Sequence, residues 1–136
     1  MGAALWFVQL VHYPRLAALR STELPARAED NIRRTSLLLG PVMLLELACS
    51  LAIIARPPVG VSPAAAWFGL ALLAGAWLST AFVQFPIHLR LARGGDPGEL
   101  RRLLRTNRLR VALWSARATL GLWLLVTHRT LGIMAA

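Results

Sequence analysis

The feature that most limits how this chain can fold is a set of three long apolar stretches. They cover residues 35–55, 64–87 and 111–127, and the only charged residues within them are Glu46 and Arg117. Crossing the hydrocarbon core of a bilayer takes about 20 apolar residues of helix. Each stretch therefore predicts a membrane-spanning helix. The composition agrees, because 57% of the residues are hydrophobic and only 15% are charged, which disfavours a soluble globular protein.

A fourth, weaker apolar stretch opens the sequence over residues 2–14, and Leu16 to Leu19 extend it past Arg15. A cleaved signal peptide carries its positive charges before the apolar run, whereas here Arg15 and Arg20 follow it. We therefore interpret this stretch as a first span that is not removed. The sequence predicts one all-α integral membrane domain over residues 1–136, with four spans at about 2–20, 33–56, 63–90 and 108–128.

The arginines predict the orientation of the spans. All 15 basic residues are arginine, and they outnumber 6 acidic residues to give a net charge of +9. Two alternate loops hold most of them: Arg15, Arg20, Arg27, Arg33 and Arg34 in one, and Arg90, Arg93, Arg101, Arg102, Arg105, Arg108 and Arg110 in the other. The positive-inside rule places both loops in the cytoplasm and both termini outside. Topology thus accounts for the basic charge, and no nucleic-acid partner is expected.

Turn residues mark the ends of the later helices. Ser62-Pro63 and Asp96-Pro97 each offer an N-cap followed by proline at the first helical position, and Glu99 occupies the capping-box position. Gly94-Gly95 ends the third helix, so the third and fourth helices are predicted at about 63–93 and 97–128. Because the connecting turns are short, neighbouring helices are antiparallel, and we expect an up-down four-helix bundle.

Polar residues recur at helical spacing in every span, which indicates a polar interior. The candidate ligand-binding residues are His12, Glu46, Thr80, Gln84, His88, Asn107, Arg110, Trp114 and Arg117. Counted along the helices, Glu46 lies about 18 Å from the cytoplasmic edge and Arg117 about 10 Å. Helix tilt and a long arginine side chain can close that gap. We therefore expect Glu46 and Arg117 to pair, either to fix helix register or to handle a ligand.

Cofactor chemistry has weak support in the sequence. A haem between His12 and His88, or a metal held by His12, Glu46 and His88, is open, but no ligand spacing selects either and no metal site is predicted. A bound quinone stays open in the same way. The single cysteine, Cys49, excludes an intrachain disulfide. No nucleophile elbow, phosphate loop or metalloprotease helix is present, so the sequence does not decide whether the protein is an enzyme.

Several short motifs resemble those of a group of small bacterial four-span membrane proteins of unassigned function. They are His12-Tyr13-Pro14, Pro41-Val42-Met43 followed by Glu46, Trp77-Leu78-Ser79-Thr80, Pro86-Ile87-His88, and Thr106-Asn107 with Trp114 and Arg117. The chain departs from that group at Asn107-Arg108-Leu109-Arg110-Val111, where the group carries Asn-Trp-x-Arg-Thr. The resemblance implies a four-span fold and a multi-pass location in the bacterial inner membrane. It supplies no activity.

Three functions fit these observations. In the first, an intramembrane polar pocket binds, with or without transforming, a small lipophilic ligand that is quinone-like or polyketide-like. In the second, the chain is a non-catalytic subunit of a larger membrane complex and its polar stripes serve packing alone. In the third, it is a small proton-coupled exporter acting as a dimer, with Glu46 as the titrating carboxylate; a homo-oligomer or a larger membrane complex is open as an assembly state. The first predicts a lined cavity, the second a tightly packed interior, and the third a continuous route to Glu46.

Overall fold

The computed structural model describes residues 1–18, 23–94 and 96–134, and the side chains of all of these except Ala17, Pro97 and residues 128–134. Within these ranges the chain is helical apart from short turns, and no strand occurs, which confirms the all-α prediction. The elements are α1 (Gly2–Phe7), η1 (Val8–His12), α2 (Tyr13–Ala17), α3 (Leu24–Ala55), α4 (Pro63–Ser79), η2 (Thr80–Gln84), α5 (Phe85–Ala92) and α6 (Pro97–Met134).

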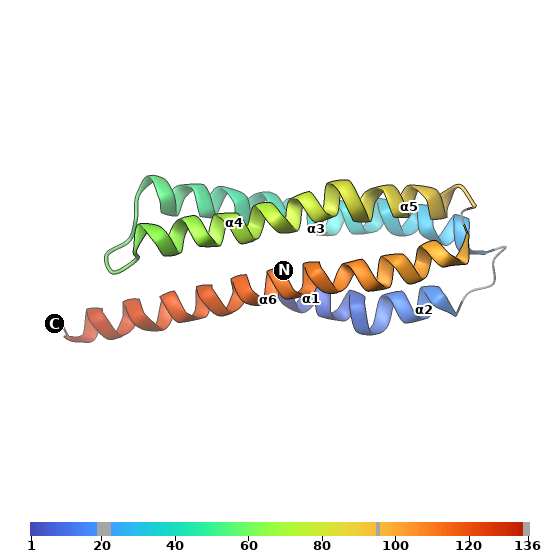
Figure 1. Ribbon diagram of the computed structural model, residues 1–136. Coiled ribbons are helices and arrows are strands. Elements are labelled where there is room, and N and C mark those ends of the chain that lie inside the picture. Colours follow the sequence, from blue (N-terminus) through green and yellow to red (C-terminus); the bar gives the residue numbers. More distant parts are fainter. Residues whose placement is uncertain (19–22, 95, 135–136) are drawn as a thin grey trace.

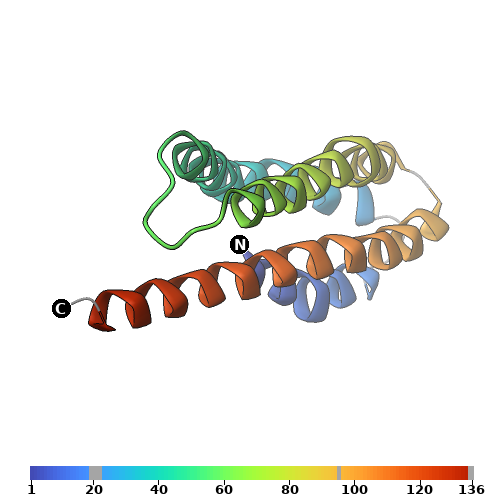
Figure 2. The same cartoon turned by 60° about the vertical axis from the view of Figure 1, so that its left-hand side comes forward.

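The helical elements form four rods that lie side by side, and each rod, called a helical length below, is one helix or a run of consecutive helical elements. The short length α1–η1–α2 runs along α6, while α3 packs along α4 and α5, and α4–η2–α5 in turn packs along α6 (Figures 1 and 2). The end of α2, the start of α3, the end of α5 and the start of α6 all lie at one end of the molecule (Figure 1). Consecutive lengths therefore run antiparallel, as the short turns predict.

Three helices are long and apolar enough to cross a membrane: Leu24–Ala55, Pro63–Ala92 and Gly98–Thr127. They contain the three apolar stretches of the sequence. Large hydrophobic side chains point outward from them, and Leu38 on α3 is 72% exposed and Phe82 on η2 is 75% exposed. Such exposure is favourable where the surroundings are lipid, so the chain has the character of a membrane protein. The first length is shorter, and residues 19 and 20 of its predicted span lie outside the described residues.

Helix ends follow the turn residues, with one difference in α3. Ser62 accepts a hydrogen bond from the Ala65 N–H at 3.2 Å, so it caps α4 as predicted. Gly94 ends α5 in the left-handed region at φ +83°, and its predicted partner Gly95 lies outside the described residues. Helix α3 begins at Leu24 instead of near residue 33, because Pro25 starts the helix well before the apolar stretch.

Two wide helical turns stand directly before prolines. In η1 the Tyr13 N–H donates to the Val8 carbonyl, and in η2 the Phe85 N–H donates to the Thr80 carbonyl, five residues back instead of four. Pro14 and Pro86 follow at once, and neither has an N–H to continue the regular pattern. The surrounding sequences are Val11-His12-Tyr13-Pro14 and Val83-Gln84-Phe85-Pro86, a local likeness between the two halves. Pro41, by contrast, lies within the continuous helix α3.

The buried interior consists of two apolar clusters with a polar layer between them. The first cluster gathers near the end where α5 meets α6 and comprises Tyr13, Leu16, Leu24, Ala28, Ile87, Leu91, Leu100 and Leu103. The second comprises Leu5, Met43, Leu73, Ala76, Val111 and Trp114. Along α6, Asn107 and Arg110 fall between Leu103 of one cluster and Val111 of the other, and both are buried. The polar layer is thus enclosed along the helix axis by hydrophobic packing.

The start of α6 gives a first testable prediction. Asp96 Oδ1 accepts the Gly98 N–H at 3.0 Å, which satisfies one free donor of the first turn. Glu99 does not complete a capping box; its carboxylate instead binds Arg90 through two hydrogen bonds of 3.0 and 3.1 Å and joins α5 to α6. We expect Asp96→Ala to lower the free energy of unfolding by about 1 kcal/mol, measured by thermal unfolding in detergent. Asp96→Asn keeps the acceptor and is expected to cost much less, so equal losses would contradict a capping role.

Candidate functional site

The polar layer is tied together by hydrogen bonds from α6 to both wide turns. Asn107 Nδ2 donates to Gln9 Oε1 at 2.8 Å, and Arg110 Nη1 donates to Asn107 Oδ1 at 3.2 Å. On the other side, Gln84 Nε2 donates to the Thr106 hydroxyl at 2.9 Å. Helix α6 therefore holds η1 and η2 at a common level, and the wide turns bring Gln9 and Gln84 inward.

A small cavity, which we call the arginine cavity, lies at this layer and measures about 90 Å³. All four helical lengths line it, through Leu5, Val8, His12, Tyr13, Asn31, Ile32, Thr35, Ser36, Leu39, Thr80, Gln84, Phe85, His88 and Arg110. The Tyr13 hydroxyl lies 3.4 Å from His88 Nε2, and Arg110 also interacts with Tyr13. The volume corresponds to about three water molecules. The cavity suits a small polar group.

Buried polar atoms without partners concentrate around this cavity. Seven such side-chain atoms occur among the described residues, namely His12 Nε2, Trp77 Nε1, Ser79 Oγ, Gln84 Oε1, His88 Nδ1, Arg110 Nε and Trp114 Nε1. Four of them belong to residues that line the arginine cavity, namely His12, Gln84, His88 and Arg110. Buried polar groups in proteins are nearly always hydrogen-bonded. Four such atoms around one hollow make the arginine cavity the strongest candidate site in the part of the chain that the structure describes.

Among these four buried side chains, Arg110 is the one whose burial costs the most free energy, because it is always charged. It is only 6% exposed, and among the described residues no carboxylate lies within ion-pair distance of it. A buried cation without a counter-charge is strongly unfavourable within a membrane and typically marks a functional position. The Asn107 carbonyl stabilises the guanidinium group but does not neutralise it. The charge therefore requires an explanation beyond packing.

A larger hollow, the lateral groove, continues from the arginine cavity. It measures about 480 Å³ and lies between α3 and the α4–η2–α5 length, lined by Thr35, Ser36, Leu39, Gly40, Met43, Leu44, Trp77, Thr80, Ala81, Phe85 and Arg110. Arg110 lines both hollows, as do Leu39 and Phe85. The exposed side chains of Leu44 and Phe85 belong to its wall, so the groove reaches the lipid-facing surface. The arginine cavity, which contains the buried polar groups, thus shares a wall with an apolar groove that opens sideways.

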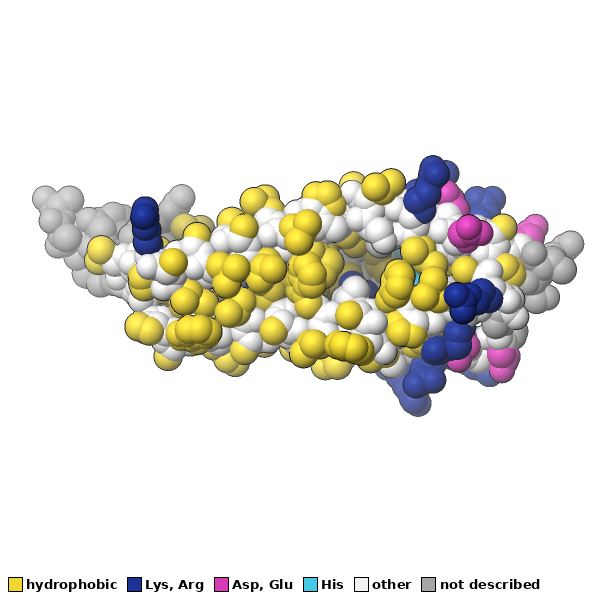
Figure 3. All heavy atoms as spheres, turned by 90° about the horizontal axis from the view of Figure 1, so that it is seen from above, with side chains coloured by type: hydrophobic (Ala, Val, Ile, Leu, Met, Phe, Trp, Pro, Cys, Tyr) yellow, Lys and Arg dark blue, Asp and Glu magenta, His cyan; other side chains and the backbone are white. Residues whose placement is uncertain are grey.

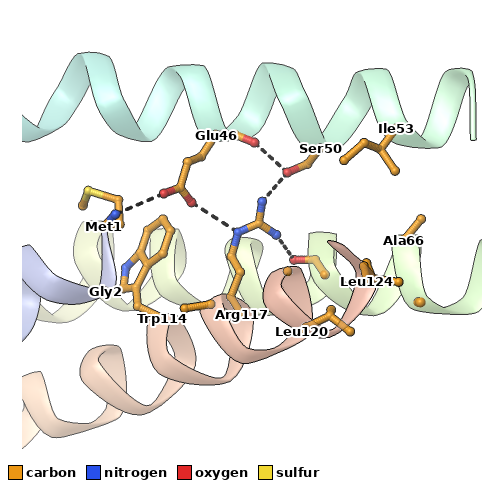
Figure 4. Close-up of a pocket in the computed structure, with 14 residues that line it drawn as sticks. Met1, Gly2, Glu46, Ser50, Ile53, Ala66, Trp114, Arg117, Leu120 and Leu124 are labelled. Carbon is orange, nitrogen blue, oxygen red and sulfur yellow. Dashed lines mark hydrogen bonds and ion pairs between the residues drawn. The ribbon is translucent and has the colours of Figure 1, made fainter. Parts of the chain in front are cut away.

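A separate cavity of about 280 Å³, the ion-pair cavity, surrounds Glu46 and Arg117 (Figure 4). Arg117 Nε lies 3.2 Å from Glu46 Oε2, which confirms the predicted pair. The other two guanidinium nitrogens donate to the Gly69 carbonyl and to the Ser50 hydroxyl, each at 2.6 Å. The Met1 backbone nitrogen lies 3.3 Å from Glu46 Oε1. Each nitrogen of the guanidinium group has a hydrogen-bond acceptor, and Glu46 supplies the counter-charge of Arg117.

The predicted site residues therefore fall into two places instead of one pocket. His12, Thr80, Gln84, His88 and Arg110 line the arginine cavity, and Asn107 binds Arg110. Glu46, Trp114 and Arg117 line the ion-pair cavity. Sequence reasoning missed the wall from α3, formed by Asn31, Thr35 and Ser36. Asn31 precedes the predicted span, while Thr35 and Ser36 lie in its first turn and were not singled out. The i, i+4 spacing of Asn31 and Thr35, whose side chains bond at 3.1 Å, is the signal that points to it.

The geometry also bears on the two cofactor alternatives. The Tyr13 ring lies between His12 and His88, with ring centroids 5.9 and 6.1 Å away, and the cavity there is much smaller than a haem. The imidazoles are therefore not arranged as axial ligands. A metal held by His12, Glu46 and His88 is contradicted by position, because Glu46 lines the other cavity. Among the described residues no group of three potential ligand side chains is assembled.

Comparison with protein-family models, with curated proteins and with solved structures finds no match to this chain. The functional argument therefore depends on the site itself.

Proposed function

We propose that this chain is a four-span protein of the bacterial inner membrane whose arginine cavity binds the polar head of a small lipophilic ligand, quinone-like or polyketide-like. The observation that carries this proposal is the convergence of four unpartnered buried polar atoms on one cavity. Lipid is the surrounding partner, and α1–η1–α2 acts as the first span beside α6 in a four-helix bundle. Both termini lie outside the cytoplasm, in keeping with the distribution of arginines.

The chemistry of the walls matches such a ligand. Arg110 Nε can donate to a ligand oxygen, and Gln84 Oε1 can accept a hydroxyl hydrogen. The apolar part of the ligand would occupy the lateral groove, against Leu39, Met43 and Phe85. If the ligand is also transformed, the contact between the Tyr13 hydroxyl and His88 Nε2 supplies the groups that can move a proton.

The other two functions draw less support. A purely structural subunit needs polar residues that satisfy one another, which holds for Glu46 and Arg117 but not around Arg110. The exporter hypothesis gives the central role to Glu46, whose carboxylate is engaged by Arg117 and lies apart from the unpartnered polar atoms around Arg110. Assembly into a homo-oligomer or a larger complex is compatible with ligand binding and is not required for it.

Native mass spectrometry of the protein purified in mild detergent tests the proposal. Gly40 and Gly121 offer a matched pair, because a Cβ atom added at either meets no atom within 4 Å, yet Gly40 lines the lateral groove and Gly121 the ion-pair cavity. We expect one small amphiphile to co-purify with the wild type and with Gly121→Phe, and to be lost from Gly40→Phe. Retention in Gly40→Phe, or loss only in Gly121→Phe, would place the ligand elsewhere.

The orientation has its own test. In a Cys49→Ala background, single cysteines at position 58, in the turn between α3 and α4, and at position 134 are expected to react with a membrane-impermeant reagent in intact cells, because that turn and the C-terminal end of α6 should face outward. Cysteine at position 101, in the arginine-rich start of α6, is the matched control and should react only after permeabilisation. Protection of positions 58 and 134 until permeabilisation would invert the topology.

A further inference from the structure

We infer that the ligand is a single-chain amphiphile with an anionic head of the carboxylate class, which pairs with Arg110 while its apolar chain leaves through the lateral groove. This inference rests on the proposed function and narrows it from any oxygen-bearing lipophile to an acid. Three independent features carry it: the charge of the cavity wall, the size of the cavity, and the basic surface beside it.

The charge of the wall is the first feature. Among the 14 residues that line the arginine cavity none is acidic, and Arg110 is a permanent cation. A neutral carbonyl would satisfy Arg110 Nε as a hydrogen-bond acceptor but would leave the positive charge buried. An anion would both accept a hydrogen bond from Arg110 Nε and neutralise its positive charge. Hydrogen bonds between ionised partners are also roughly twice as strong as neutral ones.

The size of the chamber is the second feature. A volume of about 90 Å³ accommodates a carboxylate, with room for a water molecule beside it, but not a glycerophosphate head. The adjoining groove of about 480 Å³ is lined mainly by apolar side chains and opens toward lipid. A small charged head joined to a flexible hydrocarbon chain fits this pair of hollows, whereas a phospholipid with two chains and a large head does not.

The third feature is a basic mouth on the other side of the arginine cavity. This hollow of about 240 Å³ is lined by His12, Arg15, Leu16, Arg27, Asp30, Asn31 and Arg34, and it shares His12 and Asn31 with the arginine cavity. Asp30 is engaged by Arg34, so Arg15 and Arg27 leave the mouth positive. Figure 3 shows most of the visible basic side chains at one end of the molecule, mixed with acidic ones, and hydrophobic side chains along most of the rest of the visible face. Such a field concentrates anions near the cavity.

The experiment measures binding of radiolabelled palmitate to the protein in phosphatidylcholine nanodiscs at pH 8.5, relative to protein-free nanodiscs. Unlabelled palmitate, methyl palmitate and decylubiquinone are used as competitors. We expect palmitate to compete about 10- to 100-fold better than its neutral methyl ester, in proportion to a charge-assisted hydrogen bond. Arg110→Gln should remove this preference, while Arg110→Lys, which keeps the charge, should retain part of it. Gly40→Phe should abolish binding and Gly121→Phe should leave it unchanged.

The outcomes separate this inference from the proposed function. If methyl palmitate or decylubiquinone competes as well as palmitate, and Gly40→Phe still blocks binding, the cavity is a ligand site but its ligand is not an anion. If palmitate is displaced by phosphatidylglycerol added to the bilayer, the head is a phospholipid phosphate and the carboxylate assignment is wrong. If palmitate does not bind, or binds regardless of Gly40→Phe, the inference fails. The wild-type competition decides the matter even if an Arg110 variant does not fold.

Discussion

Glu46→Gln is expected to lower the free energy of unfolding by about 3–5 kcal/mol, the range for leaving one partner of a buried ion pair uncompensated. The substitution leaves the Arg117 guanidinium charged, and the Gly69 carbonyl and Ser50 hydroxyl accept its hydrogens without neutralising it. Arg117→Leu should cost less, because Glu46 can take up a proton and become neutral whereas a guanidinium cannot. The double variant should recover much of the loss caused by Glu46→Gln alone. The measurement is a double-mutant cycle of unfolding in detergent.

Ser50→Ala is the control for this cycle. It removes a hydrogen bond to Arg117 but no charge, so a loss of about 1 kcal/mol is expected. A loss from Ser50→Ala as large as that from Glu46→Gln would assign the effect to hydrogen bonding and not to charge. Additive effects of Glu46→Gln and Arg117→Leu, with no recovery in the double variant, would contradict the ion pair itself.

Arg110→Gln is expected to act in the opposite direction and raise the free energy of unfolding of the ligand-free protein by about 1–4 kcal/mol. The substitution removes the buried charge that no carboxylate compensates and keeps a polar amide beside Asn107. The same substitution should abolish the preference for an acid over its ester. A residue that is retained for binding and reduces stability is typical of functional sites.

Chemical unfolding of delipidated protein in detergent measures this effect. Arg108→Gln is the matched control, because Arg108 lies two residues earlier on α6 with its side chain exposed. That variant should shift stability by no more than about 0.5 kcal/mol. A loss of stability in Arg110→Gln, with Arg108→Gln unchanged, would mean that the guanidinium group is compensated by its surroundings and that the cavity needs no anion.

Much of the framework was predictable because short-range chemistry sets it. Ser62, Gly94 and Asp96 act within a few residues of their own positions, so the sequence around them is sufficient to locate helix ends. The pairing of Glu46 with Arg117 was predictable from depth alone, since two charges within apolar stretches have few alternatives to meeting each other.

The division of the polar residues between two cavities was not predictable in the same way. Gln84 contacts Thr106, whereas Glu46 contacts Arg117 much further along α6, so the two side chains line different cavities because they lie at different depths in the bundle. The prolines alone do not predict the wide turns either. A wide turn precedes Pro14 and Pro86, whereas Pro41 lies within a regular α-helix. Asn31 was missed because a polar, arginine-rich segment gave no sign that α3 already begins at Leu24.

The wide turn η2 absorbs one extra residue without changing the direction in which the residues on either side of it face. An α-helix advances about 100° per residue, and a wide turn holds one residue more than an α-helical turn. Thr80 and His88 are eight residues apart in the sequence and line the same cavity. In a regular helix this spacing would turn the two side chains about 80° apart, whereas deleting one residue such as Ala81 and closing η2 into a regular turn would leave them about 20° from alignment. Closing the turn without a deletion would therefore disturb the site more than removing the residue, and a homologue of this chain with the same site should either keep η2 or lack one residue between Thr80 and Pro86.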